Sequence, residues 1–265
     1  MRLADIQPQY FPRLHYLARM LDSDVFVLRD DVQLVRTHRY PDGTRGVSYQ
    51  VHTPIKAPQG VHLLGVSIRN GPLAPICEAA VSYDQPWARK HRSVLASFYA
   101  NARHRRTLLP EIEALLAARF ETVAALNIAT TCWALARALG IAPRIPEDLT
   151  FERLAAIVEG ERPGRLRRLG LGSRWLATCA SKDPSERIVR LCELAGADEY
   201  VAGGTAFASY LDRGPFERAG IRIHVQQWTC PAYPQQFERT GHLANLSILD
   251  LLMNAPAERA ATLLC

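Results

Sequence analysis

The sequence predicts an α/β fold: a mainly parallel sheet with flanking helices, a β-hairpin insertion and a helical middle segment. Three observations lead to this prediction. The chain opens with a strand-helix-strand pattern, helical periodicity fills residues 85–139, and short strands alternate with helices again from residue 175 onward. Strands separated by helices of this length imply right-handed crossovers and parallel pairing. We therefore expect a single domain over residues 1–265, with a helical insertion at about residues 85–140.

Composition is consistent with a large buried core, because 48% of the 265 residues are hydrophobic. The net charge of +6 suits an anionic substrate or an acidic carrier protein, or reflects no specific partner. Since no signal segment and no run of about eighteen apolar residues is present, we expect a cytoplasmic protein without a membrane span. The six cysteines lack paired spacing, so reduced thiols are expected, and neither a disulfide framework nor a zinc site.

The N-terminal segment predicts two strands with a helix between them. The first strand covers residues 3–6 and stops at Gln7-Pro8, because proline cannot donate to a sheet ladder. Apolar residues at helical spacing follow Pro12, and a second strand covers residues 24–28. Ligands of parallel sheets bind at the carboxyl ends of the strands. The polar residues expected at that edge are Gln7, Tyr10, Asp30, Asp31 and Gln33.

The next segments predict a loop, a hairpin and a run of helices. Residues 37–46 read as an exposed loop with a turn at 41–43, followed by strands at 47–55 and 61–68. Residues 56–60 would form the hairpin turn between them. Helices are expected at 85–99, 108–120 and 122–139, where Gly140 fits a C-cap.

The last third predicts alternating strands and helices. We expect strands at 175–178, 199–202 and 222–226, and helices at 185–195 and 215–219. Gly203-Gly204 follows the second of these strands and can turn backbone amides toward an anion. A final helix over residues 248–254 has Ser247 as its N-cap.

Several sequence marks occur in one order over nearly the whole chain. They are QPQYFP at 7–12 with a following Tyr16, SDVFVLRDDVQ at 23–33, PIKAPQG at 54–60, WARKH at 87–91, YVAGGTAFASYL at 200–211 and LSILDLLMN at 246–254. In these marks the chain resembles the WbqC-like family, bacterial proteins typically met in gene clusters for O-antigen and related specialised products.

The resemblance implies transfer of glycine, or a similar amino acid, to an amine such as an amino-sugar nitrogen. A carrier-protein thioester or an aminoacyl-tRNA would be the donor, and the positive net charge suits either acidic partner. The chain departs from the family pattern at His15, where a glycine is usual, and around His52-Thr53, where an Asn-Arg pair is usual. If that pair contacts substrate in relatives, the acceptor differs here.

An aminoacyl transfer needs a base and groups that stabilise an oxyanion. We predict Asp31 and Asp30 as catalytic residues, either binding an ammonium group or, if burial raises a carboxyl pKa, taking its proton. His91 is the third candidate, as an acid or base, with a buried core histidine as the alternative. Predicted substrate-binding residues are Gln7, Tyr10, Gln33, Lys56, Lys90, Gly203 and Gly204.

Two other possibilities concern the nucleophile and the reaction class. Cys179 and Cys230 are each either a nucleophile for a covalent acyl-enzyme or a small buried hydrophobe. No metal or cofactor is predicted. A nucleotide-dependent enzyme, nucleotidyltransferase-like or a ligase, is one rival function, although a HIGH-type signature is absent. The other rival is a non-catalytic protein that presents a carrier or a substrate to another enzyme.

Overall fold

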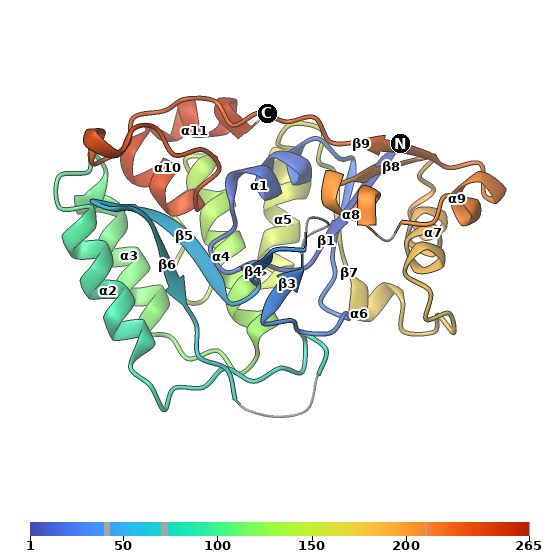
Figure 1. Cartoon of the computed structure of the whole chain (residues 1–265), viewed down its shortest axis with the longest axis horizontal. Helices are drawn as coiled ribbons and strands as arrows, with labels where there is room; N and C mark the ends of the chain where they lie inside the picture. Colours follow the sequence, from blue (N-terminus) through green and yellow to red (C-terminus); the bar gives the residue numbers. More distant parts are fainter. Residues whose placement is uncertain (40–42, 70–73, 210, 265) are drawn as a thin grey trace.

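The computed structural model (Figure 1) describes residues 1–39, 43–69, 74–209 and 211–264. Over these residues the strands form one five-stranded sheet of order β7-β2-β1-β8-β9 and two two-stranded sheets. All four strand pairs of the large sheet are parallel, which confirms the predicted α/β class. Its strands are β1 (Arg2–Ile6), β2 (Val25–Leu28), β7 (Arg168–Leu171), β8 (Glu199–Ala202) and β9 (Arg222–Val225).

The strand order makes this a doubly wound sheet. The chain runs outward from β1 through β2 to β7, then returns to the other side of β1 for β8 and β9. The switch point of such a sheet, where ligands commonly bind, lies between the carboxyl ends of β1 and β8.

The two faces of the sheet carry separate hydrophobic clusters, because side chains alternate along each strand. Phe26 and Leu28 of β2 face the larger cluster, while Val25 and Val27 face the smaller one. Helices α7 (Pro184–Ala195) and α9 (Gly214–Arg218) cover the second face. The larger cluster is built with α1 (Leu14–Leu21), α4 (Val123–Ala138), α5 (Phe151–Glu161), α10 (Ile248–Asn254) and α11 (Ala257–Leu264).

The middle of the chain is helical, in agreement with the prediction. Helices α2 (Trp87–Phe98) and α3 (Arg105–Ala117) lie beyond α4, at the end of the molecule away from α7 and α9 (Figure 1). Their apolar residues belong to the same cluster as Phe26 and Leu28. Helix α5 was not predicted; its N-cap is Thr150, whose side chain accepts a hydrogen bond from the Arg153 amide.

The two small sheets are antiparallel. The predicted loop at 37–46 contains β3 (Thr37–Arg39) paired with β4 (Arg45–Val47), and most of its predicted turn lies outside the described residues. The predicted hairpin is present as β5 (His52–Ala57) and β6 (Gly60–Gly65). Its turn is shorter than predicted, because Gly60 has a φ of 117° and closes the hairpin right after Pro58-Gln59. Lys56 therefore lies in a strand rather than in the turn.

The strand predicted at residues 175–178 is absent from the described chain. Strand β7 comes earlier, and helix α6 (Gly172–Trp175) follows it directly. Trp175 instead packs on Gly170, where a Cβ atom would lie 2.8 Å from the indole ring. Two further short helices are α8 (Gly204–Ser209) and the 3-10 turn Glu238–Thr240. None of the helices in the described ranges has the length and apolarity needed to cross a membrane.

Candidate functional site

Asp30 and Asp31 follow β2 as predicted, but both carboxylates are already bound. Asp30 accepts hydrogen bonds from the Ser173 amide at 2.8 Å and the Ser173 hydroxyl at 2.6 Å, so it caps helix α6 from outside. Asp31 pairs with Arg29 at 2.8 Å and with Arg187 at 2.5 Å. Burial raises the pKa of Asp31, but these two guanidinium groups outweigh burial and lower the pKa overall. The base role, which needs a raised pKa, stays a prediction that this geometry does not favour.

Gln7, Gly203 and Gly204 lie at the switch point of the sheet. Gln7 follows β1, and Gly203 separates β8 from α8. A Cβ atom on residue 203 would lie 2.6 Å from Nη2 of Arg19, so the guanidinium can occupy this position only because residue 203 has no side chain. Arg19 also donates to Oε1 of Gln226 at 2.8 Å. Gln33 is exposed, and its backbone forms an isolated bridge with Pro75.

Tyr10 and His91 form a buried hydrogen-bonded pair. The Tyr10 hydroxyl lies 3.0 Å from Nδ1 of His91, and the Trp87 ring packs against both residues. Burial lowers the pKa of His91 to about 4, while a bond from its ring to the Gly65 carbonyl opposes that shift. The imidazole is therefore neutral at pH 7. Because one ring nitrogen donates to Gly65, Nδ1 is left to accept the Tyr10 proton.

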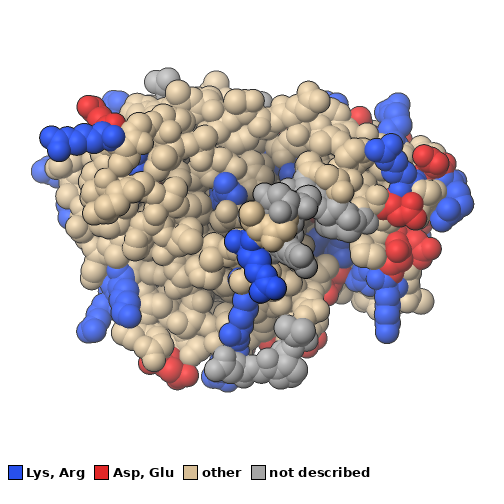
Figure 2. Space-filling view, in the orientation of Figure 1, with Lys and Arg blue, Asp and Glu red and all other residues tan. Residues whose placement is uncertain are grey.

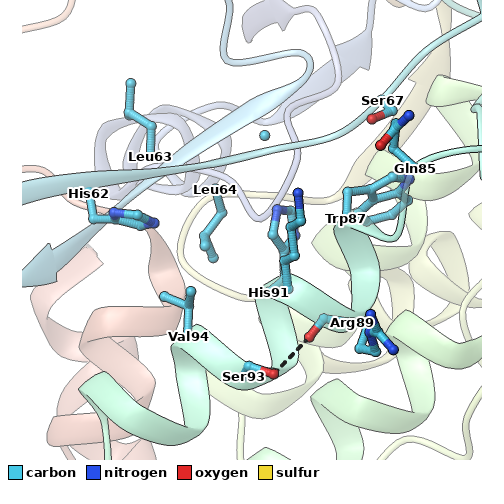
Figure 3. Close-up of a pocket in the computed structure, with 12 residues that line it drawn as sticks. His62, Leu63, Leu64, Ser67, Gln85, Trp87, Arg89, His91, Ser93 and Val94 are labelled. Carbon is cyan, nitrogen blue, oxygen red and sulfur yellow. Dashed lines mark hydrogen bonds between the residues drawn. The ribbon is translucent and has the colours of Figure 1, made fainter.

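A cavity of about 720 Å³ lies between strand β6 and helix α2, and we call it the α2–β6 groove. Its wall includes His62, Leu64, Gln85, Trp87, Lys90 and His91. Figure 3 shows His62 and Leu64 on β6 facing His91 and Val94 on α2 across this space. Lys90 and Arg89 are exposed at its rim, and no carboxylate is among the described residues that line it.

His62 is a further candidate, which was not predicted from the sequence. The ring is half-buried in the groove wall and packs edge-to-face on Phe98, with 5.4 Å between ring centroids. The sequence held a signal for it, because period-two alternation places His62 on the same strand face as the buried Leu64.

Lys56 lies in a second buried polar cluster, which also contains Asp250. The Lys56 ammonium donates to the Gly241 carbonyl at 2.6 Å, and the Tyr99 hydroxyl donates to Oδ1 of Asp250 at 2.7 Å. Burial raises the pKa of Asp250 to about 6, although Tyr99, Tyr233 and Lys56 all oppose the shift. Oδ2 of Asp250 has no hydrogen-bond partner among the described side chains and backbone. None of the described residues that line the α2–β6 groove belongs to this cluster.

The two cysteine candidates lie apart from the groove. Cys179 is half-buried and lines a shallow hollow of about 410 Å³ beside α7 and α9. Cys230 is half-buried in the irregular segment after β9, and burial raises the pKa of its thiol, which disfavours a thiolate nucleophile. Nucleophilic roles for both stay predictions. The described His, Cys, Asp and Glu side chains form no group of three placed to hold a metal ion.

Comparison with known proteins agrees with the resemblance seen in the sequence. The chain is 23% identical over 260 residues to the uncharacterized protein Rv1507c of Mycobacterium tuberculosis (strain ATCC 25618 / H37Rv). The aligned region covers 97% of this chain and 95% of that protein. No solved structure matches the chain significantly. The sequence model of the WbqC-like protein family matches residues 7–262 of this chain. This protein therefore belongs to the WbqC-like protein family.

Proposed function

We propose that the protein is an aminoacyl or acyl transferase of a biosynthetic pathway. It moves a glycyl or related group from a carrier-protein thioester or an aminoacyl-tRNA to the amine of an amino sugar or another small metabolite. The α2–β6 groove is the observation that carries this proposal. Its volume of about 720 Å³ lies in the usual range for small-molecule sites, and imidazole, aromatic and cationic groups share its wall.

The chemistry requires an uncharged amine as the nucleophile. It also requires a group that takes the proton that the nitrogen loses when it attacks the carbonyl. The amine nitrogen attacks the carbonyl carbon, the new C–N bond forms, and the C–S or C–O bond to the donor breaks. We assign proton acceptance to His62, because both ring nitrogens of His91 are engaged by Tyr10 and Gly65. The same proton then passes to the departing thiolate or alkoxide, so the imidazole returns to its starting state.

The charge of the groove supports an anionic donor. Arg89 and Lys90 stand at the rim without a described carboxylate in the lining, so phosphate groups of a carrier arm or of a tRNA end would be attracted. A cationic surrounding also lowers the pKa of an amine and favours its reactive form. Figure 2 shows Lys and Arg side chains at both ends and down the middle of one face, while most of its Asp and Glu side chains lie at the right-hand end.

A transfer assay with purified components tests this function. Wild-type protein is incubated with glycyl-loaded carrier protein or glycyl-tRNA and a panel of amino sugars, and amides are detected by mass spectrometry. We expect an amide product whose rate falls about a hundredfold or more in His62→Gln, because a positioned base contributes about 10²–10⁴-fold. The matched control is His224→Gln on β9, which lines none of the described cavities. Equal rates for His62→Gln and wild type would remove His62 from the mechanism.

A nucleotide-dependent enzyme is a second candidate, favoured by the doubly wound strand order. Nucleotides bind many such sheets at the switch point, where this chain places Gly203 and the Arg19 guanidinium. Against it, the β1 to α1 turn has no glycine, and Asp30 and Asp31 at the end of β2 are already bound. Thermal stabilisation by ATP with magnesium that disappears in Arg19→Gln would favour this candidate over the transferase.

A further inference from the structure

A second cavity adjoins the α2–β6 groove. It has a volume of about 710 Å³, and we call it the Arg69 chamber. Arg36, His52, Arg69 and Asp84 line it, together with Ser67 and Gln85, which also line the groove. Figure 3 shows the Ser67 and Gln85 side chains next to each other beside Trp87, at the end of the groove. The two cavities are therefore neighbours that share one wall.

Asp84 and Arg69 carry opposite charges, and both line the Arg69 chamber without pairing with each other. Oδ2 of Asp84 accepts a hydrogen bond from the Ser82 hydroxyl at 2.9 Å, which fixes the carboxylate, and no ion pair joins it to a described cation. The exposed Arg69 guanidinium likewise has no hydrogen bond or ion pair with any residue in the described ranges. A carboxylate and a guanidinium that border one cavity and leave each other unpaired can each bind a group of a ligand.

A dipolar ligand satisfies both charges at once. We infer that the Arg69 chamber binds the acceptor substrate, an amine that also carries an anionic group, either a phosphate or a carboxylate. Its ammonium group binds Asp84, and its anionic group binds Arg69. Binding of such a molecule stands on the chamber alone, whereas its role as acceptor rests on the proposed transferase function. The shared wall at Ser67 and Gln85 is then where acceptor and donor meet.

Calorimetric titration with four sugars tests the inference. The probes are glucosamine 6-phosphate, muramic acid, glucosamine and glucose 6-phosphate. The first two carry an ammonium group and an anionic group, which is a phosphate or a carboxylate, and the last two carry one charged group each. We expect at least one doubly charged probe to bind about tenfold or more tightly than both singly charged probes, since each lost charged contact costs about a factor of ten. The tighter of the two doubly charged probes identifies the anionic group.

Two variants locate the binding charges. Asp84→Asn should weaken binding of the doubly charged probe about tenfold and leave the affinity for glucose 6-phosphate unchanged. Arg69→Gln should weaken binding of both of these ligands and leave the affinity for glucosamine unchanged. Glu159→Gln and Arg106→Gln, exposed and outside both cavities, should bind like wild type. Equal or undetectable binding of all four probes, or full affinity in Asp84→Asn, would overturn the inference.

The outcome separates this inference from the proposed function. Selective binding of a doubly charged probe, combined with no amide from any donor, would keep the chamber and reject the transferase. Amide formation from acceptors without an anionic group, at a KM that Asp84→Asn and Arg69→Gln leave unchanged, would keep the transferase and reject the chamber as its acceptor site.

Discussion

Two pairs of buried polar residues join segments that carry the family resemblance. Tyr10 of QPQYFP bonds to His91 of WARKH, and Lys56 of PIKAPQG lies in one cluster with Asp250 of LSILDLLMN. Those segments predict binding roles for Tyr10 and Lys56, but they do not reveal the partners, because residues up to 194 positions apart meet only after folding. Lys56 is only 2% exposed, so its first role is to donate to the Gly241 carbonyl rather than to meet solvent.

The Tyr10 hydroxyl is expected to contribute to stability. Tyr10→Phe leaves Nδ1 of the buried His91 without its donor, which should lower the free energy of unfolding by about 1–2 kcal/mol. Tyr16→Phe is the matched control: its buried hydroxyl has no hydrogen-bond partner among the described residues, so its loss should be neutral or stabilising. Urea denaturation of the two variants measures both effects. Equal losses would show that the Tyr10–His91 bond contributes nothing specific.

Asp250 should make stability depend on pH. Its pKa is about 6 in the folded protein against an ordinary value of 3.8, so the folded state holds this proton more tightly. The contribution of Asp250 to the free energy of unfolding is fully present below pH 3.8 and is lost as pH rises through about 6. The total loss is up to about 3 kcal/mol. Asp250→Asn avoids that loss. Its stability relative to wild type should rise by about 1.5 kcal/mol from pH 5 to pH 8 in denaturation experiments, whereas exposed Glu159→Gln should show no such change.

At the scale of elements, local signals predicted most of the structure. Periodicity located β1, α2, α4, α7 and β8, and turn chemistry located the β5–β6 hairpin. Strand β7 and helix α6 were missed because their signals are tertiary. Residues 168–171 contain a glycine and read as weak strand, and the helix that follows is capped by Asp30 from a segment 143 residues away.

Gly172 at the start of α6 shows how tight this junction is. A Cβ atom on residue 172 would lie 1.9 Å from Oδ1 of Asp31, which Arg29 holds in place. Gly172→Ala should therefore cost about 2 kcal/mol or more, through overpacking and a disturbed ion pair. Gly160→Ala in helix α5, where no atom lies within 4 Å, should instead stabilise the protein by about 0.4–1 kcal/mol. Thermal melting of both variants is the test, and a neutral Gly172→Ala would show that Asp31 moves freely.

At the scale of the whole molecule, the sheet class followed from the sequence, while the cavities did not. The strand order and the meeting of β6 with α2 depend on long-range packing, and that packing places His62, Lys90 and His91 around one groove. The predicted residues instead lie in several separate places, which include the switch point, the groove, the buried Lys56 cluster and the junction where Asp30 meets helix α6. No single edge of the sheet collects them, because the long segment between β2 and β7 carries Lys56, Lys90 and His91 away from it.

The central claim is that the groove is a catalytic site for an anionic donor. Its most direct test is the steady-state rate of amide formation from glycyl-loaded carrier protein, with Lys90→Glu compared with the exposed control Arg106→Glu. We predict that Lys90→Glu raises KM for the donor about tenfold with little change in kcat, and that Arg106→Glu leaves both near wild type. Wild-type protein that forms no amide with any donor, while pathway output in cells still depends on Lys90, would contradict the claim and indicate a non-catalytic presenting role.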